Sequence, residues 1–115
     1  MTKSDIRLSV YREDDSVKRI NWEADDAPAD MNKEAKAMLL ALWDADARNS
    51  LRIDLWTQDM TVHDMNDFFY QTLLTMADTY QSATNNKGLM AEIKMFAREF
   101  AEKAAKFEAR PSNMP

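Results

Sequence analysis

The stretch Leu51-Arg-Ile-Asp-Leu-Trp-Thr-Gln-Asp-Met60, continued by Thr61-Val-His-Asp-Met-Asn-Asp-Phe-Phe-Tyr-Gln-Thr-Leu-Leu74, predicts one strand, one turn and the start of one helix. In its first six residues, three apolar residues alternate with Arg52, Asp54 and Trp56. A period of two is typical of a half-buried strand. We therefore expect Leu51, Ile53 and Leu55 on the inner face of this strand and Trp56 on the outer face.

A helix is predicted to begin directly after the strand. Thr61, followed three residues later by Asp64, resembles a capping box in which Asp replaces the usual Glu or Gln. The next apolar residues recur at near-helical spacing: Met65, Phe69, Leu73, Met76 and Tyr80. The segment from Asn85 to Gly88 ends this helix. A final helix follows, with an apolar stripe of Leu89, Ile93, Phe96, Phe100 and Phe107.

The residues before Leu51 predict two further strands and a short helix. Residues 5–11 alternate strictly, and residues 17–24 resume the alternation after a polar cluster, which favours an antiparallel hairpin. Residues 25–30 form the main loop, since they contain Pro28 and three acids. From Asn32 the period becomes helical, with one stripe made of Ala35, Met38, Leu39, Leu42 and Trp43.

This order of elements, β-β-α-β-α-α, predicts an α+β fold of two layers. A hairpin followed by a helical crossover places the third strand beside the first, so we expect a three-stranded antiparallel sheet of order 2-1-3. The helices are expected to pack mainly on one face of that sheet. Residues 1–110 are predicted to form a single α+β domain, followed by a flexible tail at residues 111–115.

Composition argues against several classes of protein. The chain has 115 residues, no cysteine and one glycine, which excludes disulfide scaffolds, thiol nucleophiles and a glycine-rich phosphate loop. A net charge of -5 opposes binding to nucleic acid or anionic lipid. The N-terminus is charged where a signal peptide is apolar, and no apolar run is long enough to span a membrane. We expect a cytoplasmic protein without a cofactor, a metal or direct membrane insertion.

No arrangement of residues in the chain predicts catalysis. The single histidine, His63, falls in the first turn of a predicted helix, where the neighbouring acids are explained by helix capping and the helix dipole. It has no serine partner and no further metal ligands nearby in a recognised spacing. We therefore expect a protein that is not an enzyme.

Trp56 is the best candidate for an interaction surface. Its strand places it on the outer face, which Tyr11 shares if the alternation of residues 5–11 holds. Met60 lies off the inward apolar stripes and is a further surface candidate. Tyr11, Trp56 and Met60 are thus predicted to belong to a self-association or partner interface. The alternative is that Trp56 folds under the turn at residues 57–60.

The chain resembles the gliding-motility protein GldC family. The resemblance is carried by Glu34-Ala-Lys-Ala-Met-Leu-Leu-Ala-Leu-Trp-Asp44, by residues 51–60, and by Gln71-Thr-Leu-Leu-Thr-Met-Ala-Asp-Thr79. The loop at residues 25–30 departs from the more glycine-containing link of the family. The resemblance implies a cytoplasmic accessory protein of bacterial gliding motility with no enzyme activity. Its partners would belong to the motility or associated cell-envelope machinery, and a homodimer is a possible assembly.

Two functions from different classes stay open. The first is an accessory protein that binds one folded component of the motility or envelope machinery. The second is a small acidic export-type chaperone whose methionine and aromatic surface holds unfolded client segments. The first predicts one saturable complex, whereas the second predicts binding to many unfolded chains.

Overall fold

The computed structural model describes residues 1–109, which form two compact units, Met1–Met60 and the chain from Thr61 onward. Each unit is described by itself. The predicted packing of the helices on one face of the sheet concerns both units together and stays a prediction, as does the single domain at residues 1–110. The tail predicted at residues 111–115 lies outside the described residues.

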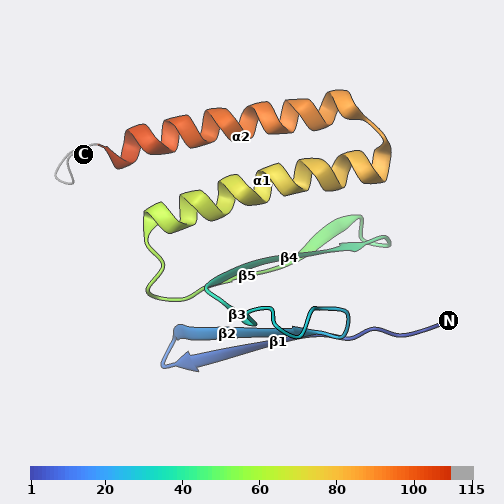
Figure 1. Ribbon diagram of the computed structural model, residues 1–115, viewed down its shortest axis with the longest axis vertical. Helices are drawn as coiled ribbons and strands as arrows, with labels where there is room; N and C mark the ends of the chain where they lie inside the picture. The colour runs from blue at the N-terminus through green and yellow to red at the C-terminus, as the bar shows by residue number, and fades with distance from the viewer. Residues whose placement is uncertain (110–115) are drawn as a thin grey trace. The chain divides into compact units, whose positions relative to one another are not determined.

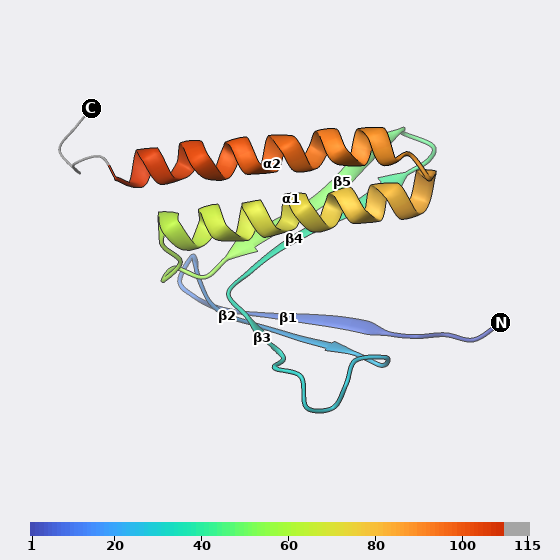
Figure 2. The ribbon, with the colours of Figure 1, turned by 45° about the horizontal axis from the view of Figure 1, so that its top comes forward.

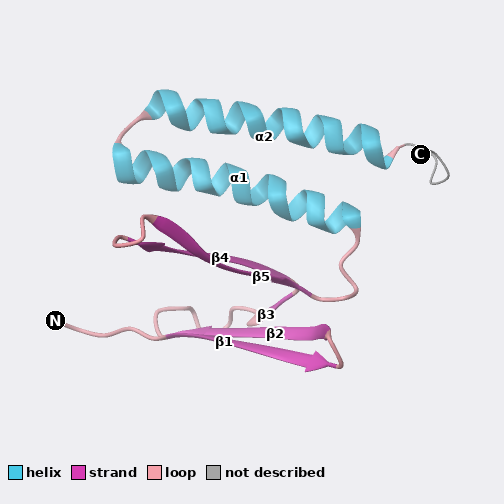
Figure 3. Ribbon diagram, turned by 180° about the vertical axis from the view of Figure 1, so that it is seen from behind, coloured by secondary structure: helices cyan, strands magenta, loops and turns pink. Residues whose placement is uncertain are grey.

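The first unit consists of antiparallel strands in two small sheets (Figures 1 and 3). One sheet has the order β1-β2-β3, and the other pairs β4 with β5. The strands are β1 (Ile6–Glu13), β2 (Ser16–Ala24), β3 (Glu34–Ala35), β4 (Ala37–Asp44) and β5 (Asn49–Trp56). The α+β class and the antiparallel pairing agree with the sequence prediction.

The predicted β1–β2 hairpin is confirmed. Glu13 pairs with Ser16, so the turn consists of Asp14 and Asp15, and Asp14 adopts a left-handed conformation with φ of 55°. Aspartate tolerates this region better than most residues. The pairing skips Lys18, which is therefore the extra residue of a β-bulge next to the turn.

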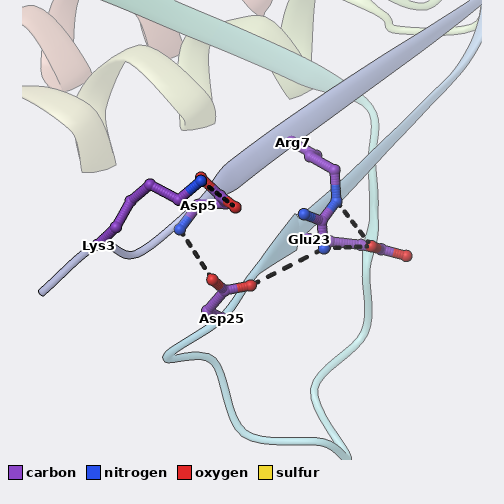
Figure 4. A network of polar contacts seen from close by, with 5 residues as sticks. All are labelled: Lys3, Asp5, Arg7, Glu23 and Asp25. Atoms are coloured by element: carbon purple, nitrogen blue, oxygen red, sulfur yellow. Dashed lines mark hydrogen bonds and ion pairs between the residues drawn. The ribbon is translucent and has the colours of Figure 1, made fainter.

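An exposed polar network lies at the opposite end of this hairpin (Figure 4). Arg7 Nη2 lies 3.2 Å from Glu23 Oε2 and 3.8 Å from Asp25 Oδ1, and the Asp5 N–H donates to Asp25 Oδ2 at 2.9 Å. Exposed ion pairs contribute little stability. The backbone bond from Asp25 N–H to the Asp5 carbonyl, at 3.0 Å, extends the pairing of the two strands past their ends.

The helix predicted from Asn32 to Trp43 is wrong, because this segment forms β3 and β4. A short apolar run fits a buried strand as well as a helix, and periodicity alone does not separate them. Its pairing with β5 opposes Met38 to Leu55, Leu40 to Ile53, and Leu42 to Leu51. Three apolar cross-strand pairs on one face outweigh the modest helix preference of Ala, Leu and Met.

The predicted strand order 2-1-3 is not found. The strand at residues 49–56 pairs with β4 rather than with β1, and β2 is the central strand of the three-stranded sheet. The strand order differs from the prediction because residues 37–44 form a strand and not the predicted helix. Once this segment is extended, β4 and β5 form a hairpin across the loop at residues 45–48, and no crossover back to β1 is needed.

The two sheets meet where the chain bends at Lys36, between β3 and β4. Ile20, which pairs with Ala35, is fully buried there, and Val17 and Thr57 are also buried. The Thr57 N–H donates to the Lys36 carbonyl at 2.8 Å, and the Gln58 N–H donates to the Val17 carbonyl at 3.0 Å. These bonds join the residues after β5 to the bend and to the start of β2. The core of this unit therefore lies at the junction of the two sheets.

The second unit is a helical hairpin of α1 (Val62–Thr84) and α2 (Lys87–Glu108), which lie side by side (Figure 2). The predicted capping box is confirmed, since Thr61 Oγ1 accepts from the Asp64 N–H and Asp64 Oδ2 accepts from the Thr61 N–H. Asn85 ends α1 in a left-handed conformation, and Asn86 caps α2 by accepting from the Leu89 N–H. The connection is therefore shorter than predicted, and Gly88 lies inside α2.

Candidate interaction surface

Trp56 is the last residue of β5 and is 55% exposed. The next residue, Thr57, is 1% exposed, and its hydroxyl donates to Asp59 Oδ1 at 2.6 Å. Residues 57–60 form the expected turn, closed by a bond of 3.1 Å from the Met60 N–H to the Thr57 carbonyl. Thr57 in this turn is buried, and the indole before it keeps more than half of its surface exposed.

The exposed indole lines an open cleft of about 310 Å³ in the first unit. Its lining comes from two segments, the β1–β2 turn region and the end of β5 with the residue Gln58 that follows it. The bond between Gln58 and Val17 brings these two segments together. The lining residues are Arg12, Asp15, Ser16, Val17, Asp54, Leu55, Trp56 and Gln58.

The cleft combines an aromatic face with charges of both signs. Arg12, Asp15 and Asp54 are exposed, and Asp54 is paired with Arg52 at 2.8 Å. Such a combination suits the recognition of a side chain or a peptide segment, in which the ring supplies apolar contact area and the charges set orientation.

The carboxylate of Asp59 stabilises the turn at residues 57–60 that follows Trp56. The hydrogen bond from the Thr57 hydroxyl, together with that from Lys36 Nζ at 3.3 Å, keeps the pKa of Asp59 below its ordinary value. Both partners favour the ionised form. Asp59 therefore links the bend at Lys36 to the turn that follows β5.

Of the three predicted surface residues, only Trp56 lines the cleft. Tyr11 is 45% exposed, but the Arg19 guanidinium covers its ring at 4.3 Å from the centroid, and it does not line the cleft of Trp56. Met60 is half-buried and also lies outside the cleft. That these three residues form one interface stays a prediction.

Sequence reasoning missed the residues that do surround Trp56, mainly Arg12, Asp15 and Gln58. Arg12 and Asp15 are distant from Trp56 in the chain, so no local pattern links them. The only local signal is the pair of turns, one after β1 and one after β5. Their meeting depends on the long-range bond between Gln58 and Val17.

In the helical unit His63 has a partner that the sequence did not reveal. Its Nδ1 lies 3.0 Å from Glu108 Oε2, and its Nε2 lies 3.4 Å from Asp67 Oδ2. Asn66 Nδ2 donates to the other Glu108 oxygen at 2.8 Å. The Glu108 contact raises the pKa of His63, and the His63 contact lowers the pKa of Glu108. The group joins the start of α1 to the end of α2 and thus closes the hairpin.

The same hairpin carries a second open surface, an apolar groove of about 480 Å³. Three aromatic residues of α2 contribute to its lining, together with three polar or charged residues. Its residues are Val62, Asn66, Phe96, Glu99, Phe100, Lys103, Ala104 and Phe107.

Residues 1–109 lack two features that mark other classes of protein. No group of three or more His, Asp or Glu side chains is arranged to hold a metal ion. Within the same range, neither helix has the length and apolar character that crossing a membrane requires.

The chain was compared with known families, curated proteins and solved structures. A family model described as gliding motility-associated protein GldC-like matches residues 17–106, which cover most of each unit. No curated protein and no solved structure matches the chain.

Proposed function

The chain belongs to the GldC-like family of gliding motility-associated proteins, and from this membership we propose that it is a non-enzymatic, cytoplasmic accessory protein of the gliding apparatus. It acts by binding a folded protein of the motility or associated cell-envelope machinery. The cleft beside Trp56 is the proposed binding surface.

The observation that carries this proposal is the open indole of Trp56 between charged groups of both signs. Tryptophan and arginine are enriched among the residues that dominate protein interfaces. Arg12 and Asp15 are exposed beside the ring and have no ion-pair partner within the described residues. A partner segment with complementary charges can therefore pair with them at the rim while its apolar part covers the ring.

The test is affinity capture from the native cell with wild-type protein, Trp56→Arg and Trp43→Arg. Trp43 is a matched control, because it is 60% exposed on β4 and lies outside the cleft. We expect one stoichiometric envelope or motility partner with wild type and Trp43→Arg, and its loss with Trp56→Arg. Fluorescence and circular dichroism check that both variants fold. Equal capture by all three proteins, with unchanged mass in light scattering, would contradict the proposal.

The second candidate, an export-type chaperone, is favoured by a different observation. Large apolar side chains are exposed on both units rather than at one place, and they include Leu42, Leu51, Met76, Met95 and Phe96. Dispersed apolar surface suits weak binding to many unfolded segments. Aggregation assays with unrelated unfolded proteins separate the two functions. Suppression of aggregation by substoichiometric protein, and capture of a heterogeneous set of precursors, would favour the chaperone.

A further inference from the structure

Strand β5 has an open edge. It is eight residues long and pairs with β4 on one side only, in a two-stranded sheet. Along residues 49–56, no backbone bond outside this ladder occurs within residues 1–109. An edge strand of this length presents unpaired N–H and C=O groups to any extended chain that lies alongside.

The two charged residues of β5 lie at equal distances from Ile53 and have opposite signs. Arg52 and Asp54 lie on the same face, on either side of Ile53, and they pair within the strand at 2.8 Å. The order is apolar, positive, apolar, negative, apolar, from Leu51 to Leu55. Reversing the direction of the strand about Ile53 therefore exchanges the positive and the negative position.

This symmetry decides how two copies of β5 can pair antiparallel. A pair centred on Ile53 opposes each Arg52 to Asp54 of the second copy, and Leu51 to Leu55. A pair centred on Arg52 opposes the two arginines, and a pair centred on Asp54 opposes the two aspartates. Opposite charges directly across a sheet stabilise the pair, and like charges destabilise it. Of these three registers, only the one centred on Ile53 is complementary.

We propose that β5 joins a second copy of this chain edge to edge, with the two-fold axis at Ile53. The result is a four-stranded antiparallel sheet of order β4-β5-β5-β4. Such a contact is isologous, and it closes as a dimer because it uses the open edge of each copy. The apolar row of Leu51, Ile53 and Leu55 continues into the second copy, and Trp56 lies beside Ser50 of that copy.

The strand edge is a small interface, since stable interfaces commonly bury ~800 Å² on each partner and an eight-residue edge offers less. We therefore expect a dissociation constant on the order of micromolar, and a mass that rises with concentration. Analytical ultracentrifugation of the full chain measures this equilibrium, and the dimer has twice the 13.3 kDa of one chain.

The first test reverses the charges. Arg52→Asp and Asp54→Arg each create two like-charge contacts across the axis, so each raises the dissociation constant at least about ten-fold. The double variant with both changes restores the pairing and returns the constant to within a few-fold of wild type. Arg98→Asp, on α2, changes the net charge as Arg52→Asp does and leaves the dimer unchanged. Fluorescence and circular dichroism verify folding.

The second test uses cross-linking, because the chain has no cysteine of its own. Ile53→Cys places two thiols directly opposite, at a Cα separation of about 4.5–5.5 Å that a disulfide can bridge. In Leu51→Cys the two thiols lie about 14 Å apart along the strands, which a disulfide cannot span. A mixture of Leu51→Cys and Leu55→Cys cross-links as the mixed dimer only.

Three results would overturn the proposal. The first is a wild-type mass of one chain at the highest concentration reached. The second is a dimer that the charge reversals leave unchanged, since it would use another surface. The third is equal cross-linking of Ile53→Cys and Leu51→Cys, which would exclude the register.

Discussion

Replacing Ile20 with alanine tests whether the junction of the two small sheets is the core of the first unit. Ile20 is 0% exposed and lies opposite Val10 on one side and Ala35 on the other. The change removes three carbon atoms, and each buried methylene contributes about 0.8 kcal/mol, so the transfer term is about 2.4 kcal/mol. The cavity left behind adds to this, within the ~2–5 kcal/mol typical of buried Ile→Ala changes.

Ile6 provides a matched control on the same face of the same hairpin. It is 75% exposed, so Ile6→Ala loses about a quarter of the transfer term, or about 0.6 kcal/mol, and leaves no cavity. The lower strand preference of alanine applies to both variants and largely cancels in the comparison. We expect Ile20→Ala to cost at least about 2 kcal/mol more than Ile6→Ala.

Tryptophan fluorescence during urea denaturation measures these differences, because Trp22, Trp43 and Trp56 all lie in the first unit. All variants are compared at one protein concentration, since self-association shifts apparent stability. A unit of about this size is stable by only a few kcal/mol, so Ile20→Val, with an expected cost of ~0.5–1.5 kcal/mol, keeps the series measurable. Equal costs for Ile20→Ala and Ile6→Ala would refute the junction as the core.

Three further predictions follow from the polar groups. Thr61→Ala removes the cap of α1 and lowers the stability of the helical hairpin by about 1 kcal/mol, read by far-ultraviolet circular dichroism, whereas Thr61→Ser does not. Thr57→Val raises the pKa of Asp59 toward its ordinary value, because the hydroxyl that stabilises the carboxylate is lost. Carbon-detected NMR titration measures the pKa of Asp59, and an unchanged value would exclude the hydrogen bond from Thr57 to Asp59. The imidazole of His63 titrates above the ordinary pKa of about 6.5, and Glu108→Gln lowers its pKa, which proton NMR resolves because the chain has one histidine. The stabilisation from His63 is complete below its unfolded pKa and is lost as pH rises through the folded pKa. That from Glu108 is complete above its unfolded pKa and is lost as pH falls through its lowered folded pKa. The hairpin therefore gains most from this pair at mildly acidic pH, and a pH-independent difference between wild type and His63→Gln would contradict the pairing.

Elements set by local chemistry could be predicted from the sequence. The β1–β2 hairpin follows from strict alternation on both sides of a polar turn, and the start of α1 follows from Thr61 and Asp64. The segment from Ala37 to Asp44 could not be predicted, because its apolar run fits both a helix and a strand. It forms a strand because it pairs with β5, and the wrong prediction of a helix here also made the predicted strand order wrong.

The candidate site was predictable only at its centre. The alternation in β5 places Trp56 away from Leu51 and Leu55, and the structure shows the indole open. The residues around it come from the β1–β2 turn, and the bulge at Lys18 shifts that turn relative to the strand pattern. A bulge is a property of the pairing of two strands, and the sequence of one strand alone does not indicate it.

The two proposed surfaces overlap at the end of β5, but Arg52 separates them. The dimer axis lies at Ile53 and the strand pairing includes Arg52, whereas the cleft is lined by Asp54, Leu55 and Trp56 at the end of the strand and by Gln58 after it. Arg52→Asp therefore weakens the dimer at a position outside the cleft lining, and the variant is monomeric at concentrations well below its raised dissociation constant. If this monomeric variant still captures the partner of the wild-type protein, one chain is sufficient for binding. If capture falls by more than the loss of dimer alone predicts, the partner contacts both copies, because two linked sites bind a two-site partner more tightly than either site alone.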